Sequence, residues 1–196
     1  MRPATAIIAL WFCFAASWLA TAVWSNTVDK RIGVKAQIPY RIALIVGGLV
    51  LAVPAHNYVG PLRLWFVTRS EAWMFIALIA CGFAFSWWAR IHLGALWSSS
   101  ITKKTDHRVI DTGPYGIVRH PIYTGILFAV YATAAVKGTV AGVAGAAIIT
   151  LGLWMKARLE EGWLANELEA GSYQRYGQRV PMLFPFGPKR KISNSR

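Results

Sequence analysis

The sequence is short of acidic residues and of cysteine. It holds 8 Asp and Glu against 21 Lys and Arg, which gives a formal net charge of +13. Its two cysteines, Cys13 and Cys81, both fall within long apolar stretches, so we expect neither a disulfide nor a cysteine-ligated zinc site. The four histidines form no metal-ligand pattern with them, and no Ser-His-Asp arrangement is evident. These absences argue against metal-dependent chemistry and against a covalent acyl-enzyme mechanism.

The excess of positive charge does not indicate nucleic-acid binding. The basic residues flank apolar stretches, where anionic lipid headgroups attract them. Outside those flanks the sequence has no basic patch with interleaved aromatic residues. We therefore expect membrane lipids, and not nucleic acid, as partners.

Apolar residues are abundant: 56% of the chain is hydrophobic and the mean hydropathy is +0.42. Two of the five apolar stretches reach the roughly 20 residues that a bilayer requires. Only Lys137 and Gly138 separate the last two, which predicts a tight helical hairpin. The sequence predicts an all-α membrane protein with about five transmembrane helices, whose apolar stretches cover residues 4–24, 40–58, 72–91, 122–136 and 139–154.

The first stretch has features of a secretory signal, because Ala20-Thr21-Ala22 resembles a cleavage site. Its apolar run is long for a signal core, however, and Arg2 is the only charged side chain ahead of it. We therefore expect a retained membrane helix.

The distribution of basic residues predicts the orientation. If the loops at residues 25–41 and 92–121 and the C-terminal tail lie inside, 17 of the 21 Lys and Arg lie inside with them, counting Arg90 at the span edge. The positive-inside rule then predicts an outside N-terminus and a cytoplasmic C-terminus, in a multi-pass protein of the bacterial inner membrane. We expect one domain over 1–196: three spans in 1–91, a cytoplasmic loop at 92–121, a helical hairpin at 122–158 and a cytoplasmic segment at 159–196.

Polar and rigid residues meet the start of an apolar run at residues 113–125. Arg119 and His120 can both hydrogen-bond, and Pro121 suits the first turn of a helix. A polar ligand held at a helix N-terminus is one interpretation. The alternative is a plain cap, in which His120 closes the helix start and Arg119 reaches a lipid phosphate.

A second polar segment begins where the fifth span ends. Glu160 and Glu161 diverge by about 100° on a helix, so one can point into the bundle while the other meets solvent or a basic partner. The alternative is a solvated helix end at which Lys156 pairs with Glu160 at i, i+4. The tail that follows, residues 180–186, is amphipathic and contains two prolines, which suits a return to the membrane surface.

Several motifs between His92 and Pro181 together resemble one family. The sequence is similar to the integral-membrane methyltransferases related to isoprenylcysteine carboxyl methyltransferase, and more distantly to phospholipid N-methyltransferases. The motifs are His92-Leu93-Gly94, Trp97-Ser98, His107-Arg108-Val109-Ile110, Gly113-Pro114-Tyr115, the segment from Arg119 to Gly125, Glu160-Glu161, Tyr173, Tyr176 and Arg179-Val180-Pro181.

This resemblance implies methyl transfer from S-adenosylmethionine, with S-adenosylhomocysteine as product, in a cytoplasm-facing pocket formed by the C-terminal half. It implies catalytic or electrostatic roles for Arg119, His120, Tyr123 and Glu161. It also implies a set of cofactor contacts at Ser100, His107, Arg108, Val109, Ile110, Tyr115, His120, Pro121, Ile122, Tyr123 and Glu161.

Two positions depart from the family pattern. Ala157 stands where the family carries an arginine that meets the substrate's carboxyl group, with Lys156 and Arg158 beside it as the candidate substrate-side cations. Ser100 stands where eukaryotic relatives carry a cofactor-contacting glutamine. The acceptor, a lipophilic small molecule or lipid-attached group, is left open as a carboxylate, an amine or a thiol.

Direct in-line displacement needs no enzyme-bound intermediate, and a dry pocket favours it by positioning the reactants. For an amine or a thiol, Glu161, His120 or Tyr123 could take the proton. Two other functions compete with this one. One is a non-catalytic membrane scaffold that keeps the fold. The other is a reductase similar to sterol reductases, for which the chain is short and lacks a strand followed by a Gly-x-Gly-x-x-Gly turn.

Overall fold

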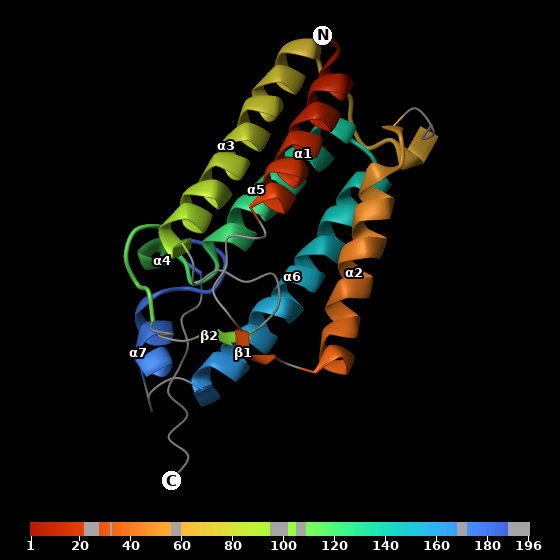
Figure 1. Ribbon diagram of the computed structural model, residues 1–196. Helices are drawn as coiled ribbons and strands as arrows, with labels where there is room; N and C mark the ends of the chain where they lie inside the picture. Colours follow the sequence, from red (N-terminus) through yellow and green to blue (C-terminus); the bar gives the residue numbers. More distant parts are fainter. Residues whose placement is uncertain are drawn as a thin grey trace.

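A computed structural model describes residues 1–21, 28–31, 33–55, 60–94, 102–104, 109–167 and 172–187. Its fold is all-α, as predicted, with long helices running side by side (Figure 1). These are α1 (Pro3–Ala20), α2 (Val34–Ala52), α3 (Arg69–Leu93), α5 (Pro121–Lys137) and α6 (Val140–Glu167). The shorter elements are η2 (Gly60–Leu62), α4 (Pro114–Ile117) and α7 (Ser172–Arg179), and an antiparallel pair of strands, β1 (Val28–Arg31) and β2 (Thr102–Lys104).

Four of the long helices, α1, α2, α3 and α6, are long and apolar enough to cross a membrane. α5 is apolar but has 17 residues. At 1.5 Å per residue it spans about 26 Å, slightly less than the roughly 30 Å of a bilayer core. The five predicted apolar stretches thus correspond to four full-length spans and one shorter helix.

The predicted boundaries of the second span were wrong. α2 begins at Val34 and ends at Ala52, six residues earlier than the apolar stretch at both ends. Pro39 lies inside α2 near its start, where few backbone hydrogen bonds are lost. Pro54 explains the early end, because it forces Val53 into an extended conformation with ψ of 127°. α6 continues well beyond the predicted Trp154, to Glu167.

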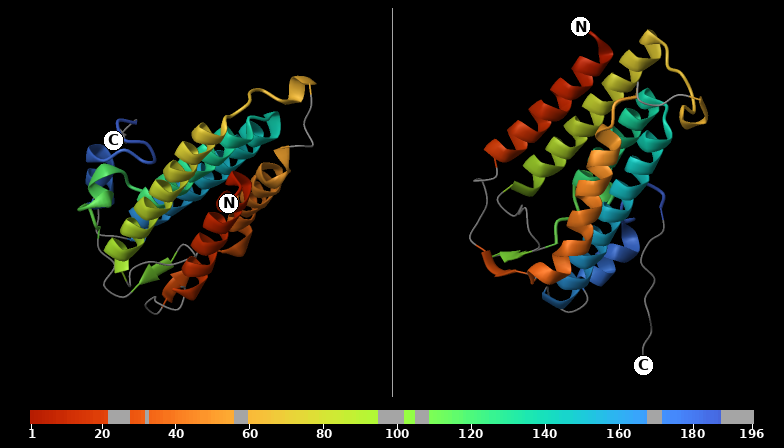
Figure 2. Two further views of the ribbon diagram at one scale, coloured as in Figure 1. Left: turned by 90° about the horizontal axis from the view of Figure 1, so that it is seen from above. Right: turned by 90° about the vertical axis from the view of Figure 1, so that its right-hand side faces the viewer.

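The helices pack as two close pairs joined through α5 and α6. α3 lies against α5 and α2 against α6, while α1 lies along α3 (Figure 2). Glycines allow both close contacts: a Cβ at Gly82 would lie 2.6 Å from the carbonyl oxygen of Gly125, and a Cβ at Gly145 would lie 2.9 Å from that of Gly47. Small residues that let backbones approach are typical of helix packing in membranes.

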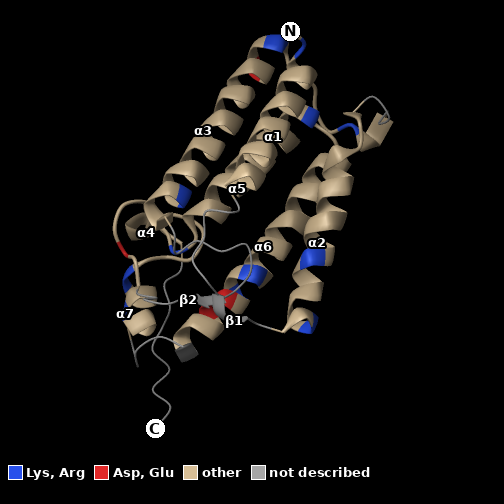
Figure 3. Cartoon of the chain, in the orientation of Figure 1, with Lys and Arg blue, Asp and Glu red and all other residues tan. Residues whose placement is uncertain are grey.

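The charged residues lie toward the two ends of the described helices (Figure 3). Apolar side chains cover the outer surface between them, as expected where the solvent is lipid. One end, where α5 begins and α6 ends, also holds α4 and α7 (Figure 1). Most of the residues that the sequence predicts for the site lie at this end.

Candidate functional site

The chain segment that enters α5 is held by a distant part of the sequence. Val118 is extended, with φ of −143° and ψ of 153°, and Pro121 occupies the first turn of α5. The backbone N–H groups of Arg119 and His120 donate to the carbonyl oxygens of Pro181 (2.8 Å) and Met182 (3.1 Å). Residues 180–183 therefore satisfy donors at the start of α5 that no turn of the helix could satisfy.

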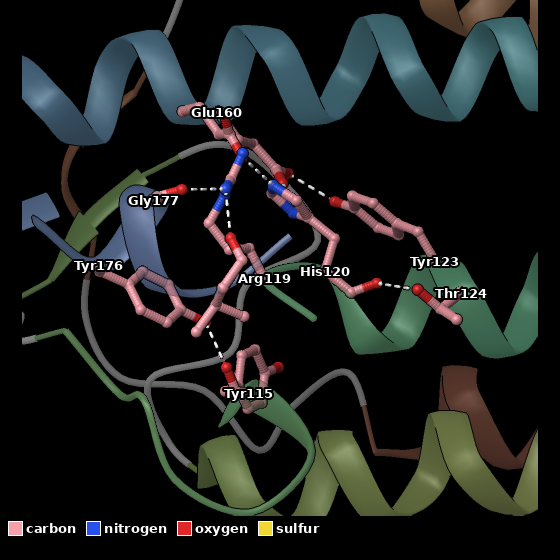
Figure 4. A network of polar contacts seen from close by, with 10 residues as sticks. Tyr115, Arg119, His120, Tyr123, Thr124, Glu160, Tyr176 and Gly177 are labelled. Carbon is pink, nitrogen blue, oxygen red and sulfur yellow. Dashed lines mark hydrogen bonds and ion pairs between the residues drawn. The ribbon is translucent and has the colours of Figure 1, made fainter. Parts of the chain in front are cut away.

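Thr124, one turn into α5, adds a side-chain contact to the same segment. Its hydroxyl lies 2.5 Å from the carbonyl oxygen of Leu183. It also lies 3.1 Å from the carbonyl oxygen of His120 (Figure 4). Pro181, Met182 and Leu183 thus contact the start of α5, while Phe184 and Phe186 are exposed. The return of this tail to the membrane surface stays a prediction.

Arg119 is buried and bridges three elements. Its Nε lies 2.6 Å from Oε1 of Glu161, and both side chains are at most 5% exposed. One terminal nitrogen donates to the carbonyl oxygens of Gly177 (2.9 Å) and Val180 (2.5 Å). The structure therefore contradicts the alternative in which Arg119 reaches out to a lipid phosphate.

His120 occupies the N-cap position of α5, but its side chain makes no capping hydrogen bond. It points instead toward α6, where Nδ1 lies 3.5 Å from Glu160 and Nε2 lies 3.3 Å from Glu161. Its ring stacks on Tyr123 at 5.3 Å between centroids. Burial on its own would lower the pKa of His120. The hydrogen bonds and charges of the two carboxylates outweigh this effect and raise the pKa above its usual value of 6.5.

Both glutamates near the end of α6 face this imidazole, and Glu160 meets basic partners rather than solvent, which is one of the two outcomes expected for it. Glu161 is 4% exposed, and the Glu160 side chain is 17% exposed. Glu160 lies beside one ring nitrogen of His120 and Glu161 beside the other. The angle of about 100° between neighbouring side chains on a helix thus allows the ring to lie between the two carboxylates. Among the residues that the structure describes, no group of three or more His, Cys, Asp or Glu is arranged to hold a metal ion.

Sequence reasoning did not list Glu160 as a site residue. The carboxylate accepts a 2.6 Å hydrogen bond from the hydroxyl of Tyr123 and lies 3.9 Å from the ammonium of Lys156. The i, i+4 pair of Lys156 and Glu160 is thus present, but it is directed into the bundle and not toward solvent. The sequence signal for Glu160 is the i, i+4 spacing from Lys156, but that spacing fits a solvated helix end equally well. We call Arg119, His120, Tyr123, Glu160 and Glu161 the ionic cluster.

Tyr115 lies in α4 beside the cluster and is buried. Gly113, with φ of +56°, lets the chain turn closely against the ring of His92, and that ring stacks on Tyr115. The hydroxyl of Tyr176 in α7 donates to the carbonyl oxygen of Tyr115 at 2.7 Å. Burial raises the pKa of both tyrosines, so both hydroxyls stay neutral.

The other predicted site residues fall into three groups. Pro121 and Ile122 are buried at the start of α5, and Val109 and Ile110 are half-buried ahead of α4. Arg158 is exposed, with its guanidinium over the ring of Trp154, so the structure does not bring it to the ionic cluster. The remaining predicted contacts, Ser100, His107 and Arg108, lie outside the described residues.

The fold and the cluster define a class: an α-helical integral-membrane protein with buried ionic chemistry at one end of its helices. A sequence model of the isoprenylcysteine carboxyl methyltransferase (ICMT) family matches residues 74–166. This match, over somewhat less than half of the chain, confirms the resemblance that the motifs indicate. No curated protein matches the chain significantly.

The matched residues contain α4, α5, most of α3 and α6, and the whole ionic cluster. α1, α2 and the 180–183 segment lie outside the match.

Proposed function

We propose that the protein transfers a methyl group from S-adenosylmethionine to a lipophilic or membrane-associated acceptor. The observation that carries this proposal is the ionic cluster itself, buried at the junction of α5 and α6 within the ICMT match. Buried charges are costly, and their retention at one point of a membrane protein marks a functional site by default.

The residues present fit S-adenosylmethionine by their chemistry. That molecule combines a carboxylate with an amine and a sulfonium, so its binding site needs groups of both signs. The Glu160 carboxylate lies within 4 Å of both His120 and Lys156. The site thus holds one negatively charged hydrogen-bond acceptor beside two hydrogen-bond donors. Glu161 and Arg119 add a second acceptor and donor directly behind them.

When bound, S-adenosylmethionine supplies an electrophilic methyl group, and S-adenosylhomocysteine remains after transfer. The protein's own task is to hold the reactants in line and away from water, because positioning and desolvation supply most of the rate in such a displacement. We assign the contacts with the nucleoside to the apolar and aromatic residues Val109, Ile110, Tyr115, Pro121 and Ile122.

Arg119 is a positioning residue in this proposal, because its contacts hold Glu161 and the 180–183 segment. His120 orients both carboxylates. For an amine or thiol acceptor, Glu160 or Glu161 would accept the proton that the nucleophile gives up when it takes the methyl group and the bond from that group to the sulfonium sulfur breaks. A carboxylate acceptor needs no such transfer.

We also propose that the ionic cluster faces the cytoplasm, the compartment in which S-adenosylmethionine is made available. The excess of Lys and Arg at this end supports the orientation, with the N-terminus outside and the chain in a bacterial inner membrane.

The test is calorimetric titration of S-adenosylhomocysteine into the purified protein in phosphatidylcholine nanodiscs. We expect a dissociation constant near 1 μM, about 8 kcal/mol. We expect a loss of at least tenfold in His120→Ala and Glu161→Ala, with Arg158→Met unchanged as the matched control. Affinity weaker than millimolar in the wild type overturns the proposal.

A second experiment identifies the acceptor. Lipid and thiol extracts are incubated with labelled S-adenosylmethionine, with and without the protein, and the products are compared by mass spectrometry. A scaffold function predicts that His120→Ala and Glu161→Ala leave the cellular phenotype unchanged at normal protein levels.

A further inference from the structure

Lys156 lies between two tyrosine rings at the edge of the ionic cluster. Its ammonium is 5.1 Å from the ring centroid of Tyr123 in α5 and 5.8 Å from that of Tyr40 in α2. Both distances fall within the range of a cation–π contact. The side chain is 16% exposed, so most of it is buried inside the protein.

The ammonium of Lys156 keeps hydrogen-bonding capacity toward a ligand. It is 3.9 Å from Oε1 of Glu160, which is an ion-pair distance and too long for a hydrogen bond. That same oxygen already accepts a short bond from the hydroxyl of Tyr123. An ammonium has three donors, and tyrosine ring faces attract its charge without using any of them. A ligand with anionic oxygens would supply the hydrogen-bond acceptors that the rings lack.

The ring of Tyr40 is fixed by a second buried polar residue of α2. The hydroxyl of Tyr40 donates to the side-chain oxygen of Gln37 at 3.0 Å, and Arg41 donates to the same oxygen at 2.8 Å. Gln37 is 3% exposed and Tyr40 is 4% exposed, on a helix that otherwise presents mostly apolar residues to lipid. A buried glutamine in a membrane helix is expensive, which points to a role beyond packing.

Apolar side chains from three helices lie further along the helix bundle, away from the ionic cluster. Leu44 is one turn beyond Tyr40, Ile126 is one turn beyond Tyr123, and Trp11 comes from α1. All three are half-buried and pack on the same core cluster. A molecule with its charge at Lys156 would therefore find hydrocarbon surroundings for its tail.

Ala157, the next residue along α6, is fully buried and carries no charge. Lys156 reaches the cluster from the neighbouring position, and α2, which supplies Tyr40, lies outside the family match.

Resting on the proposed function, we propose that Lys156 and Tyr40 form the acceptor-binding element: Lys156 binds the anionic head of an amphiphilic acceptor, and Tyr40, fixed by Gln37, positions that lysine. The head is a carboxylate or a phosphate, and the chain behind it lies among Trp11, Leu44 and Ile126. α2 thereby sets acceptor specificity, while the ionic cluster handles the methyl donor.

The test uses two probes with the same chain, 11-bromoundecanoate and 11-bromoundecanol, added to the protein in phosphatidylcholine nanodiscs at mildly alkaline pH. Bromine quenches tryptophan fluorescence, and Trp11 lies beside the expected tail. We expect saturable quenching by the carboxylate at a concentration at least tenfold lower than by the alcohol. Competition by undecyl phosphate, by acetate and by inorganic phosphate distinguishes an amphiphile site from a site for small anions.

Four variants test whether Lys156 and Tyr40 cause the preference for the carboxylate over the alcohol. Lys156→Met should abolish the tenfold difference, and Lys156→Arg should keep it. Tyr40→Leu should weaken carboxylate binding about two- to fivefold by loss of the cation–π contact, and Tyr40→Phe, which keeps the ring, should weaken it less. Arg158→Met, a neighbouring exposed cation on α6, is the control and should match the wild type.

Titration of S-adenosylhomocysteine into the same samples separates the two proposals and reports that each variant is folded. If S-adenosylhomocysteine binds but carboxylate and alcohol quench alike, or Lys156→Met keeps the difference, the acceptor site is wrong and the methyltransferase proposal stands. If small anions displace the probe as well as undecyl phosphate does, the amphiphile assignment is wrong. A preference that depends on Lys156 without S-adenosylhomocysteine binding supports the anion site and overturns the methyl-transfer function.

Discussion

Removing the carboxylate of Glu161 should destabilise the protein more than any exposed substitution, because it leaves the Arg119 guanidinium buried without its counter-ion. The two side chains are 4% and 5% exposed and meet at 2.6 Å. Breaking one side of a buried pair costs about 3 to 5 kcal/mol. Arg119 keeps its bonds to the carbonyls of Gly177 and Val180, so we place Glu161→Leu at about 3 kcal/mol and Glu161→Gln at about 2 kcal/mol.

A double-mutant cycle isolates this pair from the rest of the cluster. Arg119→Met and Glu161→Leu together should cost less than the sum of the single changes, with a coupling of about 2 kcal/mol, because the double variant leaves neither charge alone. His120 keeps Glu160 as a partner in all three variants.

The assay is unfolding by sodium dodecyl sulfate in mixed micelles, followed by tryptophan fluorescence and by circular dichroism. Arg158→Met serves as the control for removing a cation from the same end of the protein, and it should change stability by less than about 0.5 kcal/mol. Additive single costs, or a cost below about 1 kcal/mol for Glu161→Leu, would refute the inference that a buried ion pair holds α5, α6 and the C-terminal segment together.

Three further predictions test separate contacts. Gly125→Ala should cost about 1 to 3 kcal/mol or more in the same unfolding assay, because its methyl group would press on the backbone of α3. Gly48→Ala, with open space at its Cβ, should be close to neutral, and equal costs would contradict the packing argument. The pKa of His120 is raised in the folded protein, so its contribution to stability is complete below pH 6.5 and is lost as the pH rises through the higher folded pKa. Unfolding midpoints measured over a pH series should show this loss in the wild type and not in His120→Gln. Tyr176→Phe should cost about 1 to 2 kcal/mol by leaving the carbonyl of Tyr115 unpaired, and hydrogen exchange of α7 should speed up if that bond holds it in place.

The apolar pattern was sufficient to predict the helices, because membrane spans are defined by length and hydropathy alone. It failed at α2, where the apolar residues run on past Pro54 although the helix ends at Ala52. Hydropathy records where a segment is soluble in lipid, whereas Pro54 decides where the backbone can stay helical.

The site was predicted in part. Local sequence placed Arg119 and His120 at a helix start and Glu161 at a helix end, and the structure brings His120 and Glu161 to 3.3 Å. Sequence could not show that Pro181 and Met182 bind the same turn, since a contact across about 60 residues leaves no local signal. The inward direction of Glu160 depends on His120, which is also far from it in the chain.

The contact between the 180–183 segment and the start of α5 has a consequence for biosynthesis. Residues 119–124 leave the ribosome long before their partners, so the helices can insert while the guanidinium of Arg119 and two backbone amides still wait for their acceptors. The start of α5 is thus completed only after the C-terminal segment has been made, and a product truncated just ahead of Pro181 would be inserted in the bilayer with these contacts missing.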